Sequence, residues 1–78
     1  MTKKITNSFT LVISNDYQGL YCNGVLVDQD HKISASEALC RVIEYGGISI
    51  FRRVDCDTDW LDDLGEFPEK LEDVKLIE

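Results

Sequence analysis

The sequence predicts an α+β fold in which a small antiparallel sheet of four to five strands carries one amphipathic helix packed on one face. Three observations predict it: apolar and polar residues alternate near the N-terminus, an Asn-Gly step joins two apolar segments, and a serine-capped segment repeats its apolar residues at helical spacing. The expected order is β-β-β-α-β, followed by a short helix and a short terminal strand. The chain has 78 residues, too few for two cores, so we expect one domain over residues 1–78.

The first three strands follow from alternation and turn chemistry. Residues 5–14 alternate Ser or Thr with apolar side chains on the opposite face, which predicts a half-buried strand. The apolar face consists of Ile5, Phe9, Leu11 and Ile13. Residues 15–19 are rich in turn formers. Asn23-Gly24 favours a type I′ hairpin because both central positions of that turn need positive φ, and residues 28–32 are expected to form a polar loop.

A single helix is expected over residues 34–45. Ser34 and Glu37 fit a capping box, in which the serine hydroxyl accepts from the third backbone amide and the glutamate returns to the cap amide. The apolar stripe of this helix consists of Ala35, Leu39, Val42 and Ile43. Gly46-Gly47 then supplies a left-handed exit.

The C-terminal part adds a fourth strand and two short elements. Residues 48–54 are β-rich and are expected to rejoin the first sheet, because one short helix cannot cover a second sheet. Thr58 can cap a short helix over residues 59–64, which Gly65 ends. Residues 74–77 have the composition of a last short strand.

The charge of the chain is uneven. Residues 1–54 hold six Lys or Arg and five Asp or Glu, a sum of +1, whereas residues 55–78 hold two and ten, a sum of −8. The basic residues are scattered, which argues against direct nucleic-acid binding. The longest apolar runs are far shorter than the roughly 20 residues that cross a bilayer, so we expect no membrane partner. Three cysteines and no signal peptide predict a reduced, cytoplasmic protein.

The most suggestive chemical pattern is the spacing of a calcium-binding loop. Positions 1, 3, 5, 9 and 12 of that loop are occupied by Asp55, Asp57, Asp59, Asp63 and Glu66. Position six, which needs positive φ, is Trp60, and position eight, normally apolar, is Asp62. We therefore expect an acidic strand end that runs into a capped helix, with a divalent-cation-binding domain as an alternative.

Zinc and catalytic patterns are weak. Cys22, His31, Cys40 and Cys56 are spaced by nine, nine and sixteen residues, without the short pairs that chelate zinc, so the cysteines are expected to be buried structural residues. No local signature pairs His31 with a nucleophile, and turns and a helix end account for every glycine. We expect no cofactor and no enzymatic activity.

The acidic C-terminal third remains as a recognition surface. Its carboxylates would steer a basic partner toward the protein, and two aromatic side chains would anchor that partner. The candidate partner-binding residues are Asp55, Asp57, Asp59, Trp60, Asp62, Asp63, Glu66 and Phe67. A second interpretation folds the apolar residues of this segment, Trp60 and Leu64 among them, onto the sheet and leaves the acids facing outward.

In size, acidity and α+β layout the chain resembles the small inhibitors that phages and mobile elements direct against host defence nucleases, including anti-CRISPR proteins. The resemblance is one of type, without a shared motif. It implies a phage accessory protein that mimics nucleic acid and occupies a basic site on a larger protein. The alternative from another class is a homo-oligomeric structural or regulatory module, for example a homodimer in which an exposed strand edge pairs with a second copy.

Overall fold

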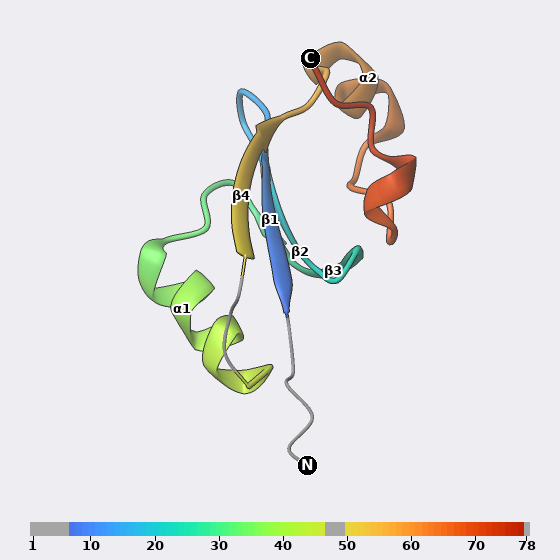
Figure 1. Ribbon diagram of the computed structural model, residues 1–78. Helices are drawn as coiled ribbons and strands as arrows, with labels where there is room; N and C mark the ends of the chain where they lie inside the picture. The colour runs from blue at the N-terminus through green and yellow to red at the C-terminus, as the bar shows by residue number, and fades with distance from the viewer. Residues whose placement is uncertain (1–6, 47–49, 78) are drawn as a thin grey trace.

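The computed structural model describes residues 7–46 and 50–77 and confirms a small α+β fold (Figure 1). The elements in chain order are β1 (Ser8–Ile13), β2 (Gln18–Cys22), β3 (Val25–Asp30), α1 (Ala35–Glu44), β4 (Ile50–Asp55), α2 (Thr58–Leu64) and a 3-10 helix (Leu71–Asp73). The predicted order is confirmed from the first strand to the second helix. Residues 5–6 and 47–49, which the sequence analysis assigned to two strand starts and the helix exit, lie outside the described residues.

The four strands form one sheet in the order β3-β2-β1-β4. β2 pairs antiparallel with both β1 and β3, but β4 pairs parallel with β1. The sheet is therefore mixed, and the prediction that it is antiparallel throughout was wrong. The reason is topological, because α1 returns the chain to the end of the sheet where β1 begins, so that β4 runs in the same direction as β1.

The hairpin between β2 and β3 confirms the turn chemistry. Asn23 and Gly24 have φ of 53° and 85°, so both central positions adopt the positive φ that a type I′ turn requires. A register shift beside Leu20 and Tyr21 marks a bulge in this pair of strands. β3 then continues to Asp30, so the expected polar loop over residues 28–32 was wrong for its first three residues.

α1 begins and ends as predicted, but it buries less than expected. The Ser34 hydroxyl accepts from the Glu37 backbone N–H at 3.1 Å and lies 3.2 Å from the Glu37 carboxylate. Val42 is buried, whereas Leu39 and Ile43 keep 59% and 68% of their surface exposed. The predicted apolar stripe is wider than the part of the helix that contacts the sheet, so three of its four residues remain exposed.

Both faces of the sheet are covered. α1 packs on one face, and α2 with the residues that follow it packs on the other (Figure 1). In β1, Phe9 belongs to the cluster under α1 and Val12 belongs to the cluster under α2, and both are fully buried. The prediction of a half-buried β1 was therefore wrong, whereas the amphipathic helix does pack on one face as predicted.

The second layer is tied to both edges of the sheet by residues 66–77, which we call the C-terminal segment. At the β3 edge, the Leu26 N–H donates to the Glu69 oxygen and the Leu71 N–H donates to the Gly24 oxygen, each at 2.8 Å. At the β4 edge, the Asp57 N–H donates to the Lys75 oxygen at 2.8 Å, and the Ile77 N–H donates to the Asp55 oxygen at 2.9 Å. The C-terminal segment thus spans the sheet from one edge strand to the other.

The prediction of a terminal strand over residues 74–77 was wrong, because these residues do not form a regular strand. The segment pairs with the end of β4 through one isolated antiparallel bridge, Cys56 with Leu76, and a 3-10 helix precedes it. A full strand would direct every second side chain away from the sheet. The observed path instead turns Leu71, Val74 and Leu76 toward one apolar cluster.

Phe67 holds the C-terminal segment against the sheet. Its ring is 3% exposed, stacks on Tyr17 with centroids 5.7 Å apart, and meets Tyr21 edge-on at 6.4 Å. The Tyr21 hydroxyl donates to the Pro68 oxygen at 2.6 Å. A Cβ atom at Gly19 would lie 2.9 Å from a carbon of the Phe67 ring. Only glycine therefore leaves room for the ring on β2.

We predict that Gly19→Ala destabilises the protein by about 1–3 kcal/mol, because the added methyl overpacks the Phe67 ring. Urea unfolding gives this value, with Ser36→Ala, an exposed change on α1, as the control. In the double variant with Phe67→Leu, the smaller side chain relieves the clash, so the two changes cost less together than the sum of the separate changes. Strict additivity would contradict the contact.

Candidate functional site

The candidate residues lie together beyond the carboxyl ends of β1 and β4 (Figure 1). Asp55 ends β4, four of the others lie on α2, and Glu66 and Phe67 follow the helix. Five of the carboxylate residues are exposed: Asp55, Asp59, Asp62, Asp63 and Glu66. We call these five residues the acidic face. The other three candidates are half-buried or buried and have different roles.

α2 turns the acidic face outward because its other side packs on the sheet. Leu61 is 4% exposed and belongs to the cluster with Val12 and Tyr21, and the half-buried Trp60 packs against the same cluster. Leu64 stays 49% exposed, so the expected packing role is confirmed for Trp60 and wrong for Leu64. With Leu61 directed inward, Asp59, Asp62 and Asp63 occupy exposed positions around the helix.

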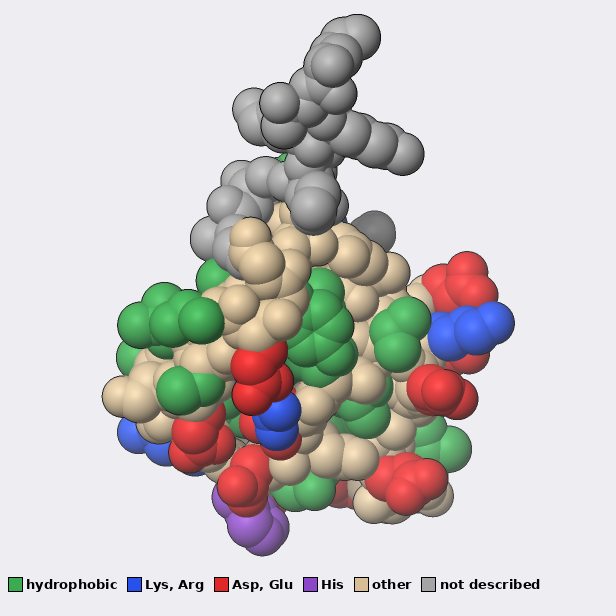
Figure 2. Space-filling model, turned by 90° about the horizontal axis from the view of Figure 1, so that it is seen from below, with side chains coloured by type: hydrophobic (Ala, Val, Ile, Leu, Met, Phe, Trp, Pro, Cys, Tyr) green, Lys and Arg blue, Asp and Glu red, His purple; other side chains and the backbone are tan. Residues whose placement is uncertain are grey.

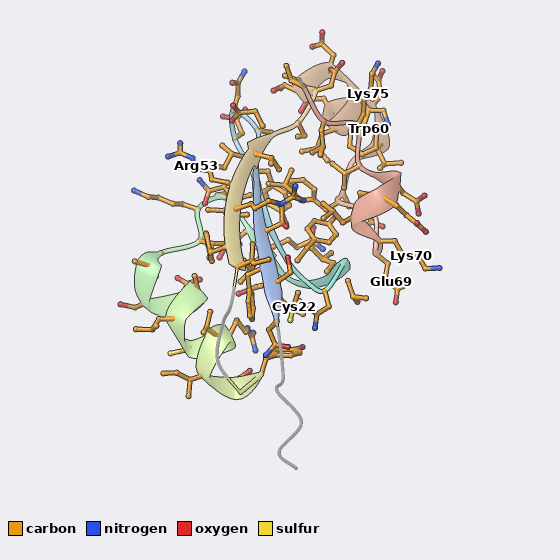
Figure 3. The ribbon with its side chains drawn as sticks, viewed as in Figure 1. Cys22, Arg53, Trp60, Glu69, Lys70 and Lys75 are labelled. Carbon is orange, nitrogen blue, oxygen red and sulfur yellow. The ribbon has the colours of Figure 1, made fainter. Side chains whose placement is uncertain are left out.

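Asp57 is the cap of α2. Its Oδ1 accepts from the Trp60 backbone N–H at 3.1 Å, and its Oδ2 lies 3.4 Å from the Lys75 Nζ. The cap is therefore one residue earlier than Thr58, which the sequence analysis assigned to it. The hydrogen bond from the Trp60 N–H, together with the Lys75 ammonium, lowers the pKa of the Asp57 carboxyl. Figure 3 shows Trp60 and Lys75 at the same end of the molecule.

Phe67 supports the acidic face from beneath. Its buried ring fills the space between α2 and the sheet, so it has no surface with which to contact a partner. The expected role of Phe67 as an anchor for a partner was therefore wrong, because its side chain points into the core and not toward the solvent. Apolar side chains next to carboxylates are equally compatible with a hot spot and with a core. The sequence around Phe67 does not distinguish a partner-binding residue from a core residue, because the deciding feature is the distant Gly19, which lies opposite the ring.

A hollow beside α2 adds residues that the sequence analysis missed. It measures about 360 Å³, and Asp62 and Glu66 line it from the α2 side. Asp16 and Tyr17 line it from the β1–β2 turn, and His31 lines it from the end of β3. The His31 Nδ1 lies 3.1 Å from the Asp16 backbone oxygen, and the imidazole meets the Tyr17 ring edge-on at 5.4 Å.

The topology could have indicated this hollow. Because β1, β3 and β4 run in the same direction, the segments that follow each of them meet at one end of the sheet. The β1–β2 turn carries Asp16, the end of β3 precedes His31, and β4 leads into α2. The required signal was the parallel pairing of β4 with β1, which no local motif indicates.

The calcium and zinc patterns are spread over separate elements. Within residues 7–46 and 50–77, no three His, Cys, Asp or Glu side chains are grouped so that they could hold a metal ion. Cys22 and Cys56 are buried in opposite layers, and burial raises the pKa of both thiols. Cys40 is exposed, so the expectation of a buried residue was wrong there. In the described part of the chain, neither α1 nor α2 has the length and apolar character needed to span a membrane.

No protein-family model, no curated protein and no solved structure matches this chain. The site is therefore defined by its own geometry. It consists of five exposed carboxylates on and beside a helix that is capped by Asp57, together with an adjoining hollow that two of them, Asp62 and Glu66, line from one side and Asp16 lines from the other.

We predict that Asp57→Asn keeps the cap but changes the acid stability of the protein. Because the folded pKa of Asp57 lies below that of a free aspartate, about 3.9, its ionised form stabilises the protein above that pH. This contribution is lost as pH falls through the folded pKa. The wild type should therefore lose more of its melting temperature between pH 6 and pH 2 than Asp57→Asn does.

Asp57→Ala is the matched control, since it removes the cap at every pH and should melt at a lower temperature throughout. Melting curves that fall in parallel with pH for the wild type and Asp57→Asn would contradict the assigned role of Asp57.

Proposed function

We propose that this protein is a small, non-enzymatic binding domain that docks through its acidic face on a basic site of a larger protein. The observation that carries the proposal is the fixed outward position of five carboxylates, three on α2 and one on each side of it, while the opposite side of the helix is buried in the core. A rigid set of charges binds at a lower entropic cost than a mobile one, because the partner need not order it.

Few cations offset the acidic face. The C-terminal third holds ten Asp or Glu and two Lys. Among the described residues of that third, one ion pair is formed, between Lys75 and Asp57, and it involves no member of the acidic face. The uncompensated charge creates a field that accelerates encounter with a basic surface and weakens as salt is added.

The hollow beside α2 suits a basic side chain of the partner. Carboxylates of Asp16, Asp62 and Glu66 line it from two sides, and the Tyr17 ring and Leu61 add apolar surface. A lysine or arginine side chain combines a charged end with an apolar stem, so it matches both kinds of lining. Specificity would come from this concave part of the site, and the exposed acids would contribute mainly to the rate of association.

Carboxylates held at fixed positions on a protein surface can replace the phosphates of a nucleic acid. We therefore place this protein among nucleic-acid mimics that occupy a basic, nucleic-acid-binding site, as a phage or mobile-element inhibitor in the cytoplasm would. No step of this proposal requires catalysis or a cofactor. The partner is defined by its chemistry, which is a cluster of Lys and Arg that normally contacts phosphates.

We predict that binding depends on the position of the carboxylates in the acidic face and not only on the net charge of the protein. Partner protein is first isolated from cell extract at low salt by affinity capture on the wild type. A face variant carries Asp59→Asn, Asp62→Asn, Asp63→Asn and Glu66→Gln. It should bind that partner at least about tenfold more weakly, and the salt dependence of the dissociation constant should become less steep.

A control variant makes the same change in net charge at exposed residues away from α2: Glu37→Gln, Glu44→Gln, Glu69→Gln and Glu72→Gln. Its affinity should stay within about threefold of the wild type, since rim charges far from the contact act weakly. Equal losses in the two variants would show that net charge alone matters, and the proposed docking site would then be wrong.

A further inference from the structure

Part of the outer edge of β4 is open in the described part of the chain. The C-terminal segment covers the outer edge of β3 at residues 24–26 and the outer edge of β4 at residues 55–57. Alternate residues of β4 face β1, because the Ile50 N–H donates to Asn7 and the Cys56 N–H donates to Ile13. The backbone groups of Phe51 and Arg53 therefore point outward, beyond the reach of the C-terminal segment.

An apolar groove lies beside this open edge. Ala35, Ala38, Leu39 and Val42 of α1 and Phe51 of β4 line a hollow of about 290 Å³. Leu39 is 59% exposed and Phe51 is 46% exposed. Figure 2 shows hydrophobic side chains on the surface at the side where α1 lies in Figure 1. An exposed apolar groove next to unpaired backbone groups has the features of a strand-addition site.

The charge beside the groove is positive. Arg52 and Arg53 are both exposed, and neither forms an ion pair with another described residue. Successive strand residues point to opposite faces, so one guanidinium lies on each side of the edge. Arg53 shares the α1 face with Phe51, and Figure 3 shows it pointing away from the sheet.

We propose that the open edge of β4 binds an extended segment of a partner protein as an added antiparallel strand. This segment contains two consecutive acidic residues followed by an apolar residue. The bridge between Cys56 and Leu76 shows that the outer side of β4 accepts an antiparallel neighbour. Such a segment meets Arg53 first, then Arg52, and then Phe51. Its two carboxylates pair with the guanidinium groups, and its apolar side chain enters the groove.

The arginines disfavour a second copy of this chain as the occupant. If two β4 strands paired so that Phe51 of each faced Arg53 of the other, the two copies of Arg52 would lie directly opposite each other. Like charges at that position destabilise an antiparallel pair, and charged residues on an edge strand are a known protection against self-association. The same charges attract a strand that carries carboxylates, so the edge selects an acidic partner over itself.

The test uses a fluorescein-labelled peptide, Thr-Val-Glu-Asp-Leu-Thr-Val, with binding followed by fluorescence anisotropy. We expect saturable binding, about tenfold weaker for Arg53→Glu and for Leu39→Asp. Slowed hydrogen exchange at the Phe51 and Arg53 amides should accompany it. The face variant of α2 should bind this peptide like the wild type, so that failure of strand addition is distinct from failure of the proposed docking role.

Two control peptides distinguish strand addition from attraction by charge alone. Replacing the Glu-Asp pair by Lys-Lys should abolish binding. Methylating the backbone nitrogen of the peptide leucine removes the donor to the Phe51 carbonyl and should weaken binding at least about tenfold. The proposal is overturned by no binding at millimolar peptide, by equal binding of the methylated peptide, or by a dimer in sedimentation that Phe51→Glu dissociates.

Discussion

The burial of Phe67 against Gly19 is the contact on which the rest of the molecule depends. It places an aromatic ring between Tyr17 and Tyr21 and brings the following residues across the second face of the sheet. From there the C-terminal segment reaches both edge strands and closes the cluster that contains Leu61. α2 is consequently fixed on one side, and its carboxylates have a defined direction. A sheet with one covered face would leave the same acids on a mobile tail.

The positions of the two proposed surfaces depend on which parts of the sheet the C-terminal segment covers. Where the C-terminal segment packs, its apolar side chains are buried in the core, and the side chains left exposed are mostly acidic. Where that segment ends, β4 keeps an open edge with two arginines and an apolar groove under α1. Opposite charges thus occupy separate places, each set by secondary structure. Such an arrangement allows one small domain to contact two partners of different chemistry.

Local signals in the sequence predicted local structure well. The positive φ that Asn23 and Gly24 need, the Ser34 cap and the end of α2 at Gly65 each involve residues close in the chain, so the physical cause is visible in the sequence. That β4 joins the same sheet was also predictable, since one helix cannot cover two sheets, but its place next to β1 was not. The direction of β4 was not predictable either, because it depends on the end of the sheet to which α1 returns the chain.

The misassignments in the site share one cause, which is packing between distant segments. Phe67 lies in an acidic stretch that reads as surface, and its burial depends on a glycine 48 positions earlier. Leu39 and Ile43 have the spacing of a buried stripe, yet α1 packs on the sheet in a way that leaves both exposed. Asp16 and His31 join α2 only because three strands run in the same direction. None of these relations leaves a periodic or compositional mark.

Native-state hydrogen exchange tests the central claim most directly. The amides of Leu26, Asp57, Leu71 and Ile77 donate the hydrogen bonds that tie the C-terminal segment to the two edge strands. If this segment is an integral layer of the fold, these amides exchange as slowly as those of β1 and β2, in one cooperative unit. If they exchange at the rate of an unprotected chain while β1 and β2 stay protected, the sheet does not hold the acidic face in place, and a rigid docking surface on α2 is contradicted.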